Sequence, residues 1–219
     1  MSQDNQKFRV IATEYLTQFI EAAIHCTLLS RDVYPPSEIL TKRRFGVCVR
    51  LCAEHAVRKY VRNFLSSIRM AMFNGRIHAV CVLIRGVNES IAGERFVVEI
   101  PNDFARILYH EKLSSPDQTE LELACIASHV LSDAYRCLER RLGLLGKPQI
   151  DEKTWEVYID IKQSPLGSEM IDVPVGCILL DNENEDTQRE SSCYSRLPLK
   201  SSLVDDSVLL VTYIDIAET

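Results

Sequence analysis

The chain has 219 residues, of which 46% are hydrophobic and 26% are charged, and these fractions exclude collagen-like, low-complexity and globally disordered proteins. Its 25 Lys and Arg residues are outnumbered by 31 Asp and Glu residues, which gives a formal net charge of −6 at pH 7. Because a phosphate backbone attracts clustered Lys and Arg, a chain with this charge is not expected to bind nucleic acid directly.

The first part of the chain predicts two amphipathic helices joined by a basic loop. Apolar residues recur with a 3.6-residue period over residues 8–30, and this helix must end before Pro35, since proline disfavours helix in the preceding residue. The loop contains the basic residues 42–44, and a second apolar stripe follows over residues 53–72. The other face of the second helix is basic, with Arg58, Lys59, Arg62 and Arg69. We interpret both basic clusters as solvated surface, and phosphate contact or nuclear import is the alternative.

The following residues predict strands around a long third helix. The apolar run over residues 77–84 is typical of a strand buried on both faces, and residues 94–100 alternate as its hairpin partner. Ser115, Pro116 and Gln118 form a start signal for a helix that continues to residue 142. Alternation over residues 154–162 predicts a strand with one solvated face, and a last alternating strand spans residues 207–216.

This order of elements predicts an α+β fold in which three helices pack on one face of an antiparallel sheet. We expect a single domain over residues 1–219, with a core at residues 1–163 and a distinct C-terminal segment at residues 164–219. The segment contains several prolines and glycines and an acidic middle, so it is a candidate for ordering when a partner binds.

Sequence motifs for catalysis or cofactor binding are missing. The chain has no glycine-rich dinucleotide loop, no Walker loop, no HExxH motif and no nucleophile elbow, and its eight cysteines lack zinc-finger spacing. His78 is interpreted as a hydrogen-bonded core residue, and Glu21 and His25 as a pair at the core boundary, with metal binding as the alternative. We expect no catalytic residues, no metal and no cofactor, and an uncharacterised α+β enzyme is the competing hypothesis.

Targeting signals are also missing. No apolar run is long enough to cross a bilayer, and the polar residues 1–7 lack the apolar core of a signal peptide. These features predict a cytosolic or nuclear protein that has no membrane partner.

The end of the first helix carries the sequence RDVYPP at residues 31–36, and with the basic loop after it this resembles the start of a HORMA domain. The resemblance continues in order through the second helix around Tyr60, the buried strand and its partner, the third helix, and the strand around Trp155. The tail sequence RLPLK at residues 196–200, with Tyr213 in the last strand, most resembles the HORMA accessory subunit of translesion DNA polymerase zeta. The spindle-checkpoint HORMA protein lacks this Pro-Leu-Lys sequence.

The resemblance implies a HORMA fold with a mobile C-terminal safety belt, residues 164–219, that wraps over a client peptide. It implies a non-catalytic adaptor that acts in translesion DNA synthesis in the nucleus. The client would be a short proline-containing peptide of the catalytic subunit of DNA polymerase zeta. The alternative is a spindle-checkpoint or meiotic HORMA adaptor with a different peptide client.

The resemblance also implies which residues form the client-peptide pocket. These are Tyr60 on the second helix, Trp155 on the sheet, Cys177 in the belt and Leu197 where the belt returns. Flat and rigid aromatic rings suit proline, although core packing is the competing interpretation of Tyr60 and Trp155. Cys177 stands where the family often has a tryptophan, and a thiol covers far less area than an indole.

Two further surfaces follow from the resemblance. Leu197, Val211 and Tyr213 would dock the C-terminal domain of a second translesion polymerase, although animal relatives carry a polar residue in place of Val211. Family members also pair through the third helix, and the arginine that they use falls near Ser132 and Asp133, which are therefore the candidate homodimer contacts.

Overall fold

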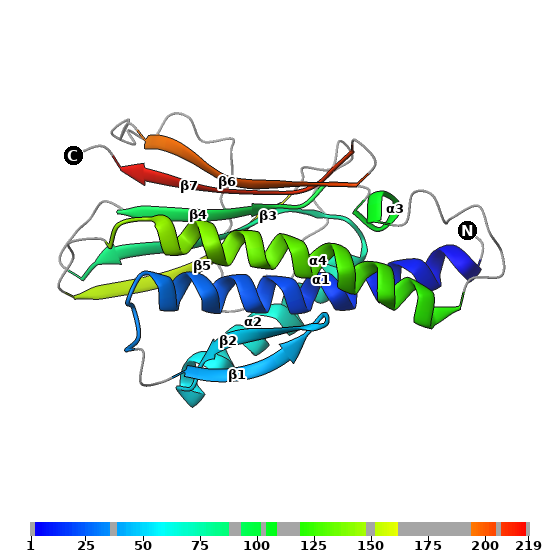
Figure 1. Cartoon of the computed structure of the whole chain (residues 1–219), viewed down its shortest axis with the longest axis horizontal. Helices are drawn as coiled ribbons and strands as arrows, with labels where there is room; N and C mark the ends of the chain where they lie inside the picture. The colour runs from blue at the N-terminus through cyan, green and yellow to red at the C-terminus, as the bar shows by residue number, and fades with distance from the viewer. Residues whose placement is uncertain are drawn as a thin grey trace.

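Helix α1 (Gln3–Ser30) lies between two layers of the fold (Figure 1). The structure is a computed structural model that describes residues 3–35, 39–87, 93–101, 104–108, 119–147, 152–161, 194–204 and 207–217. Every residue from Ala22 to Leu29 is buried, so this part of α1 is covered on all sides rather than along one stripe. The predicted helix is therefore confirmed, and the burial of its polar side shows that a second layer covers it.

The first layer is a five-stranded antiparallel sheet with the strand order β5-β3-β4-β7-β6. The strands are β3 (Ile77–Gly86), β4 (Glu94–Glu99), β5 (Lys153–Ile161), β6 (Tyr194–Val204) and β7 (Ser207–Ala217). Inner-face side chains such as Val82, Phe96 and Ile214 join the main core beneath α1. The outer face has its own small apolar cluster of Ala79, Cys81, Val97, Tyr158 and Tyr213. The α+β fold with helices packed on an antiparallel sheet is confirmed.

The prediction that β5 has one solvated face holds only in part, because Tyr158 is only 9% exposed there whereas Glu156 and Asp160 on the same face are partly exposed. A second correction concerns His78, which is exposed rather than buried in the core. The pairing register between β3 and β5 shifts between Ile77 and Ala79, and such a bulge takes the intervening residue out of the regular alternation.

The second layer is a hairpin that the sequence did not predict. Residues 42–44 form the end of β1 (Ile39–Arg44), which pairs with β2 (Val47–Cys52), and are not a loop. The turn residues Phe45 and Gly46 have φ values of 31° and 81°, as a two-residue type I′ turn requires. Val49 and Leu51 of β2 are buried, which explains how the hairpin covers α1.

The other predicted helices agree with the structure, except that one of them begins at a different residue. Helix α2 (His55–Phe73) lies close to the predicted residues 53–72. Helix α4 (Glu120–Leu144) begins after the N-cap Thr119, whose hydroxyl forms a capping box with Glu122, so Ser115 is not its cap. Ser115, Pro116 and Gln118 lie outside the described residues. A short helix, α3 (Phe104–Leu108), was not predicted.

The C-terminal strands belong to the same sheet as the core strands, since β7 pairs directly with β4. Strands β5 and β6 are the outermost strands at opposite edges. The predicted boundary between residues 163 and 164 lies outside the described residues and stays a prediction.

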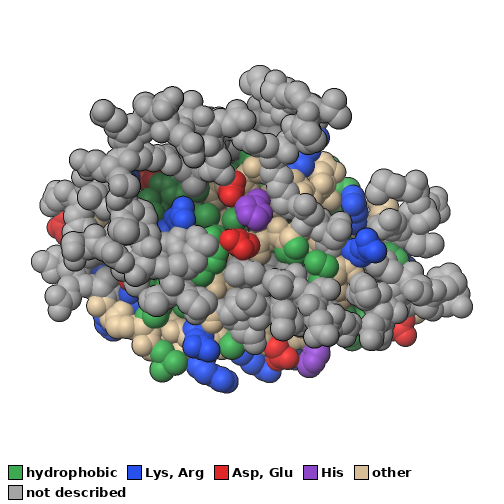
Figure 2. Space-filling model, turned by 90° about the horizontal axis from the view of Figure 1, so that it is seen from above, with side chains coloured by type: hydrophobic (Ala, Val, Ile, Leu, Met, Phe, Trp, Pro, Cys, Tyr) green, Lys and Arg blue, Asp and Glu red, His purple; other side chains and the backbone are tan. Residues whose placement is uncertain are grey.

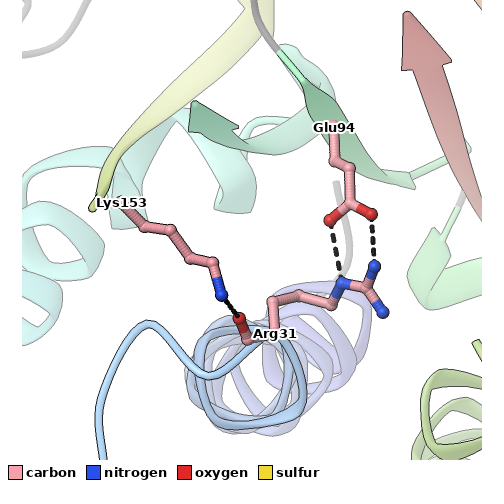
Figure 3. A network of polar contacts seen from close by, with 3 residues as sticks. All are labelled: Arg31, Glu94 and Lys153. Atoms are coloured by element: carbon pink, nitrogen blue, oxygen red, sulfur yellow. Dashed lines mark hydrogen bonds and ion pairs between the residues drawn. The ribbon is translucent and has the colours of Figure 1, made fainter. Parts of the chain in front are cut away.

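A buried ion pair fixes the end of α1 against the sheet (Figure 3). Both side chains are almost inaccessible, with Arg31 2% and Glu94 6% exposed. Arg31 Nε donates to Glu94 Oε2 at 2.8 Å, its Nη2 donates to Glu94 Oε1, and its guanidinium carbon lies 5.9 Å from the Phe96 ring centroid. Lys153 Nζ donates to the backbone carbonyl of Arg31 at 2.9 Å, which brings the start of β5 to the same point.

We expect Glu94→Gln to destabilise the protein by roughly 3–5 kcal/mol, because it leaves the Arg31 cation buried without a counter-charge. The midpoint of urea unfolding measures this loss. Glu14→Gln is the matched control, since Glu14 pairs with Arg69 on the surface and its side chain is 46% exposed. The control should lose at most about 1 kcal/mol. Equal losses in the two variants would show that the buried pair has no special role.

A buried histidine joins α1 to the hairpin. His25 is 0% exposed, and its Nδ1 accepts a hydrogen bond from the Cys52 backbone N–H at 3.3 Å. Burial lowers the pKa of His25 from 6.5 to about 4, Glu21 opposes this shift, and Arg58 adds to it. His25 is therefore an interior residue and not part of a boundary pair, because the hairpin covers it.

The sign of this shift predicts acid sensitivity. Between pH 6.5 and 4 the unfolded chain protonates His25 whereas the folded protein keeps it neutral, so stability falls as pH falls. The shift corresponds to a loss of roughly 3 kcal/mol across this range. Unfolding midpoints measured at several pH values should show that His25→Gln loses less stability between pH 6.5 and 4 than wild type does. The control His55→Gln changes an exposed histidine and should keep the fall.

Candidate functional site

Three aromatic side chains from different parts of the chain meet beside the sheet. The rings of Tyr60 on α2 and Trp155 on β5 have centroids 5.3 Å apart and planes at 88°, an edge-to-face contact. The indole Nε1 of Trp155 donates to the hydroxyl of Tyr34 at 2.8 Å. We call Tyr34, Tyr60 and Trp155 the aromatic cluster.

Local structure explains how the cluster forms. Val57, Val61 and Phe64 on α2 are buried, and Tyr60 lies at the boundary of this face and is 39% exposed. Trp155 lies on the same face of β5 as Val157 and Ile159, and it packs partly buried against the main core. The predicted proximity of Tyr60 and Trp155 is thus observed, and both rings are partly exposed rather than enclosed in the core.

Tyr34 is the member of the cluster that was not predicted. Helix α1 ends in a Schellman turn, in which Val33 N–H donates to the Leu28 carbonyl at 3.0 Å and Asp32 adopts a φ of 52°. Lys147 pairs with the Asp32 carboxylate at 2.5 Å. The only available signal was the family-like sequence RDVYPP, which contains Tyr34 but does not show which residue it contacts.

The cluster lies at an edge of the sheet. Strand β5 pairs with β3 and is the outermost strand on its side of the described sheet. An outermost strand presents backbone N–H and C=O groups to which another extended segment can bind. An apolar aromatic surface and a strand edge therefore lie next to each other at Trp155.

The metal-ligating residue types His, Cys, Asp and Glu lie outside the aromatic cluster. In the described part of the chain, no group of three His, Cys, Asp or Glu residues could hold a metal ion, and the six cysteines there are free. Burial raises the pKa values of Tyr135 and Tyr158 and raises that of the Cys26 thiol to about 11. These groups lie in the interior and not in the aromatic cluster, so their shifts reflect packing. None of the described helices is both long enough and apolar enough to cross a membrane.

The remaining pocket residues are not placed beside the aromatic cluster. Cys177 lies outside the described residues. Leu197 is opposite Ile214 in the pairing of β6 with β7, and β6 is the outermost strand at the other edge of the sheet. Three strands therefore separate the strand of Leu197 from that of Trp155, and the role of Leu197 stays a prediction.

The predicted second-partner residues are neighbours on the C-terminal hairpin. Val211 is opposite Glu99 of β4 and Ser201 of β6 in the strand register. Tyr213 is opposite Val97 of β4, and its side chain is 7% exposed within the outer-face cluster. Their role as a docking surface stays a prediction.

The predicted homodimer residues on α4 differ in exposure. Ser132 is 7% exposed, and its hydroxyl donates to the His129 carbonyl at 2.8 Å. Asp133 is exposed and lies 3.5 Å from Arg136. Asp133 is therefore the one of the pair that a second copy could reach, and the homodimer stays a prediction.

Curated relatives match part of the chain. Over 100 residues it is 26% identical to the mitotic spindle assembly checkpoint protein MAD2B of Danio rerio, covering 46% of this chain and 47% of that protein. It is 24% identical to human MAD2B over 100 residues, again covering 46% of this chain and 47% of that protein. It is 21% identical to MAD2A of Dictyostelium discoideum over 95 residues, covering 43% of this chain and 47% of that protein. The matched part spans about half the length of these relatives. No protein-family model matches the chain.

Solved structures match nearly the whole fold. A chain of the mitotic checkpoint complex superposes with a TM-score of 0.61 and 14% identity, covering 94% of this chain and 99% of that one. C. elegans HTP-2 bound to the HIM-3 closure motif superposes with a TM-score of 0.57 and 10% identity, covering 93% of this chain and 89% of that one. This chain has the HORMA fold. The HORMA fold expected from RDVYPP and the later elements is confirmed. Because the sequence identities are this low, the similarity to these structures concerns the fold alone.

The Tyr34 hydroxyl should hold the chain's only tryptophan in place. We expect Tyr34→Phe to cost about 1 kcal/mol, because the partly buried indole N–H loses its acceptor. The unfolding midpoint and the emission maximum of Trp155 should both change. Tyr15→Phe on α1 alters a partly buried tyrosine outside the cluster and should leave the emission unchanged. Unchanged emission in Tyr34→Phe would contradict this positioning role.

Proposed function

We propose that this HORMA-domain protein is a non-catalytic adaptor subunit of DNA polymerase zeta in translesion DNA synthesis in the nucleus. The aromatic cluster at the edge of β5 is the observation that supports it most directly. The protein would trap a short proline-containing peptide of the catalytic subunit. It would also bridge to the C-terminal domain of a second translesion polymerase through Leu197, Val211 and Tyr213. The polymerase-zeta-like tail sequence supports this choice of complex, and the MAD2B matches support a HORMA adaptor.

The cluster and the strand edge would contribute different parts of peptide recognition. An extended peptide would add to β5 through backbone hydrogen bonds, which give affinity with little dependence on sequence. A proline of that peptide would then pack on the exposed ring of Tyr60 and on Trp155, and this contact would give specificity. Tyr34 would act indirectly by fixing the orientation of the indole.

The safety belt is implied by the family resemblance. The described chain leaves the sheet at Ile161, at the β5 edge, and re-enters it at Tyr194, at the opposite edge. A client paired with β5 would therefore lie beside the point where the chain leaves the sheet. A segment wrapped over the client would mainly slow its dissociation, because affinity differences between related complexes arise mostly in the off-rate.

A spindle-checkpoint or meiotic HORMA adaptor is the second candidate. The match to a chain of the mitotic checkpoint complex and the match to HTP-2 bound to a closure motif favour it. It has the same fold and the same mode of peptide binding, but its client differs. Affinity purification of the tagged protein from its own cells decides between the two. Recovery of the polymerase zeta catalytic subunit supports the first candidate, and recovery of checkpoint or chromosome-axis proteins without it supports the second.

Mutation of the cluster tests the binding site directly. We expect Tyr60→Ala to weaken binding of the proline-containing peptide about 30-fold, which corresponds to a loss of about 2 kcal/mol for a central aromatic contact. Calorimetric titration measures the affinity, and the change in Trp155 emission reports occupancy beside the ring. Met70→Ala is the matched control, because Met70 is a large apolar residue of α2 that is 65% exposed and lies outside the cluster. Equal affinities for Tyr60→Ala and Met70→Ala would remove Tyr60 from the site.

A further inference from the structure

Charge is distributed very unevenly along this acidic chain. Residues 39–76, which form the β1–β2 hairpin and α2, contain nine of the 25 Lys and Arg residues and one of the 31 Asp and Glu residues. This stretch therefore carries a formal charge of +8, and the rest of the chain carries −14. The net charge of −6 conceals a strongly basic unit.

The fold places both basic elements, the β1–β2 hairpin and α2, against one face of α1. Glu14 and Glu21 are seven residues apart on α1 and therefore share a face. Arg69 of α2 binds Glu14 at 2.6 Å, and Arg44 of the hairpin binds Glu21 at 2.9 Å. The hairpin and α2 therefore both contact this face of α1, which brings the arginines Arg44 and Arg69 of the two sequence clusters near each other.

The basic side chains of α2 lie in a row along one side of the helix. Arg58, Arg62 and Arg69 lie at helical spacings on one side of α2, about 6 Å and 10 Å apart along its axis at 1.5 Å per residue. Arg58 is near enough to α1 to lower the pKa of His25. Tyr60 contacts Trp155 on the other side of α2, so the row and the aromatic cluster do not overlap.

Acidic neighbours offset only some of these charges. Arg44, Arg50 and Arg69 pair with carboxylates of the helices. Four other side chains are exposed and have no carboxylate partner among the described residues: Lys42, Arg43, Lys59 and Arg62. We call these four, with Arg58, the basic surface. The view from above, on the other side of the molecule from β1 and β2, instead shows Asp and Glu side chains among the described Lys and Arg side chains (Figure 2).

We propose that the basic surface binds the phosphate backbone of duplex DNA without sequence specificity. Contacts from several spaced cations supply most of the affinity of non-specific DNA binding. An acidic peptide would also need an apolar anchor for stable binding, and a single strand would need aromatic side chains for stacking. The only large apolar side chains of α2 that are well exposed are Tyr60, which belongs to the aromatic cluster, and Met70. The acidic remainder of the protein would repel DNA and so orient it toward this surface.

This proposal does not rest on the proposed client, because the two surfaces lie on different sides of α2. It also explains why the total charge predicted no contact with nucleic acid. A net charge averages over the whole molecule, whereas a phosphate backbone responds to the charges within about one Debye length, about 8–10 Å at moderate salt.

Fluorescence anisotropy with the full chain and a labelled duplex of about 20 base pairs, starting at about 50 mM salt, tests the proposal. The double variant Lys59→Gln/Arg62→Gln should bind about tenfold more weakly than wild type, and its slope of log affinity against log salt should be smaller by about two. The control Arg106→Gln/Arg141→Gln removes the same charge from exposed positions on α3 and α4 and should bind within about twofold of wild type. Circular dichroism checks that both variants are folded.

Three outcomes would overturn the proposal. The first is an absence of salt-dependent duplex binding by wild type, and the second is an equal loss of affinity in the two double variants, which would mean that only total charge matters. The third is tighter binding of an oligo-glutamate peptide than of the duplex at matched charge, which would assign the surface to an acidic protein instead. Loss of peptide binding in Tyr60→Ala leaves the DNA measurement unaffected, so the proposed client and this proposal can fail separately.

Discussion

The buried pair of Arg31 and Glu94 is the contact on which the geometry of the candidate site depends. It fixes the last turn of α1 against β4, and Lys153 binds the carbonyl of Arg31 so that β5 starts at the same point. Tyr34 follows Arg31 by three residues and Trp155 follows Lys153 by two, so the two partners of the indole hydrogen bond both extend from this fixed point. The rings are therefore held by a polar network that is anchored on a buried ion pair, although the rings are partly exposed themselves.

Helix α1 also separates two kinds of surface. The sheet, with its apolar inner face, packs on one side of the helix, and the basic hairpin lies on the other. Glu14 and Glu21 partly neutralise the arginines nearest to the helix, which allows cations to cluster there without a large repulsive cost. Helix α2 borders both regions and directs Tyr60 to one and its arginines to the other. The aromatic cluster and the basic side chains of α2 therefore lie on different sides of one helix, so the two proposed binding functions would not compete.

Sequence patterns predicted the elements whose periodicity is set by burial. The helices at residues 8–30 and 53–72 and the strands around Val80 and Val157 agree with the structure within a few residues, because one buried face determines their apolar spacing. The hairpin was not predicted, since its basic residues resemble a loop and its turn places Phe45 at a positive φ, where glycine or asparagine is usual. Tyr60 and Trp155 could be proposed from family resemblance, but the contact of Tyr34 with Trp155 spans 121 positions and leaves no local pattern.

The long sequence distance between α1 and its partners has a consequence for synthesis on the ribosome. The region from Ala22 to Leu29 is buried on all sides, yet the Lys153 contact to Arg31 spans 122 positions. At about 5–20 residues per second, the ribosome needs roughly 6–24 s to add these residues. During that interval this largely apolar part of the chain has no complete core to enter. Chaperones that hold nascent chains would therefore meet this protein first through a helix segment that is later buried on all sides.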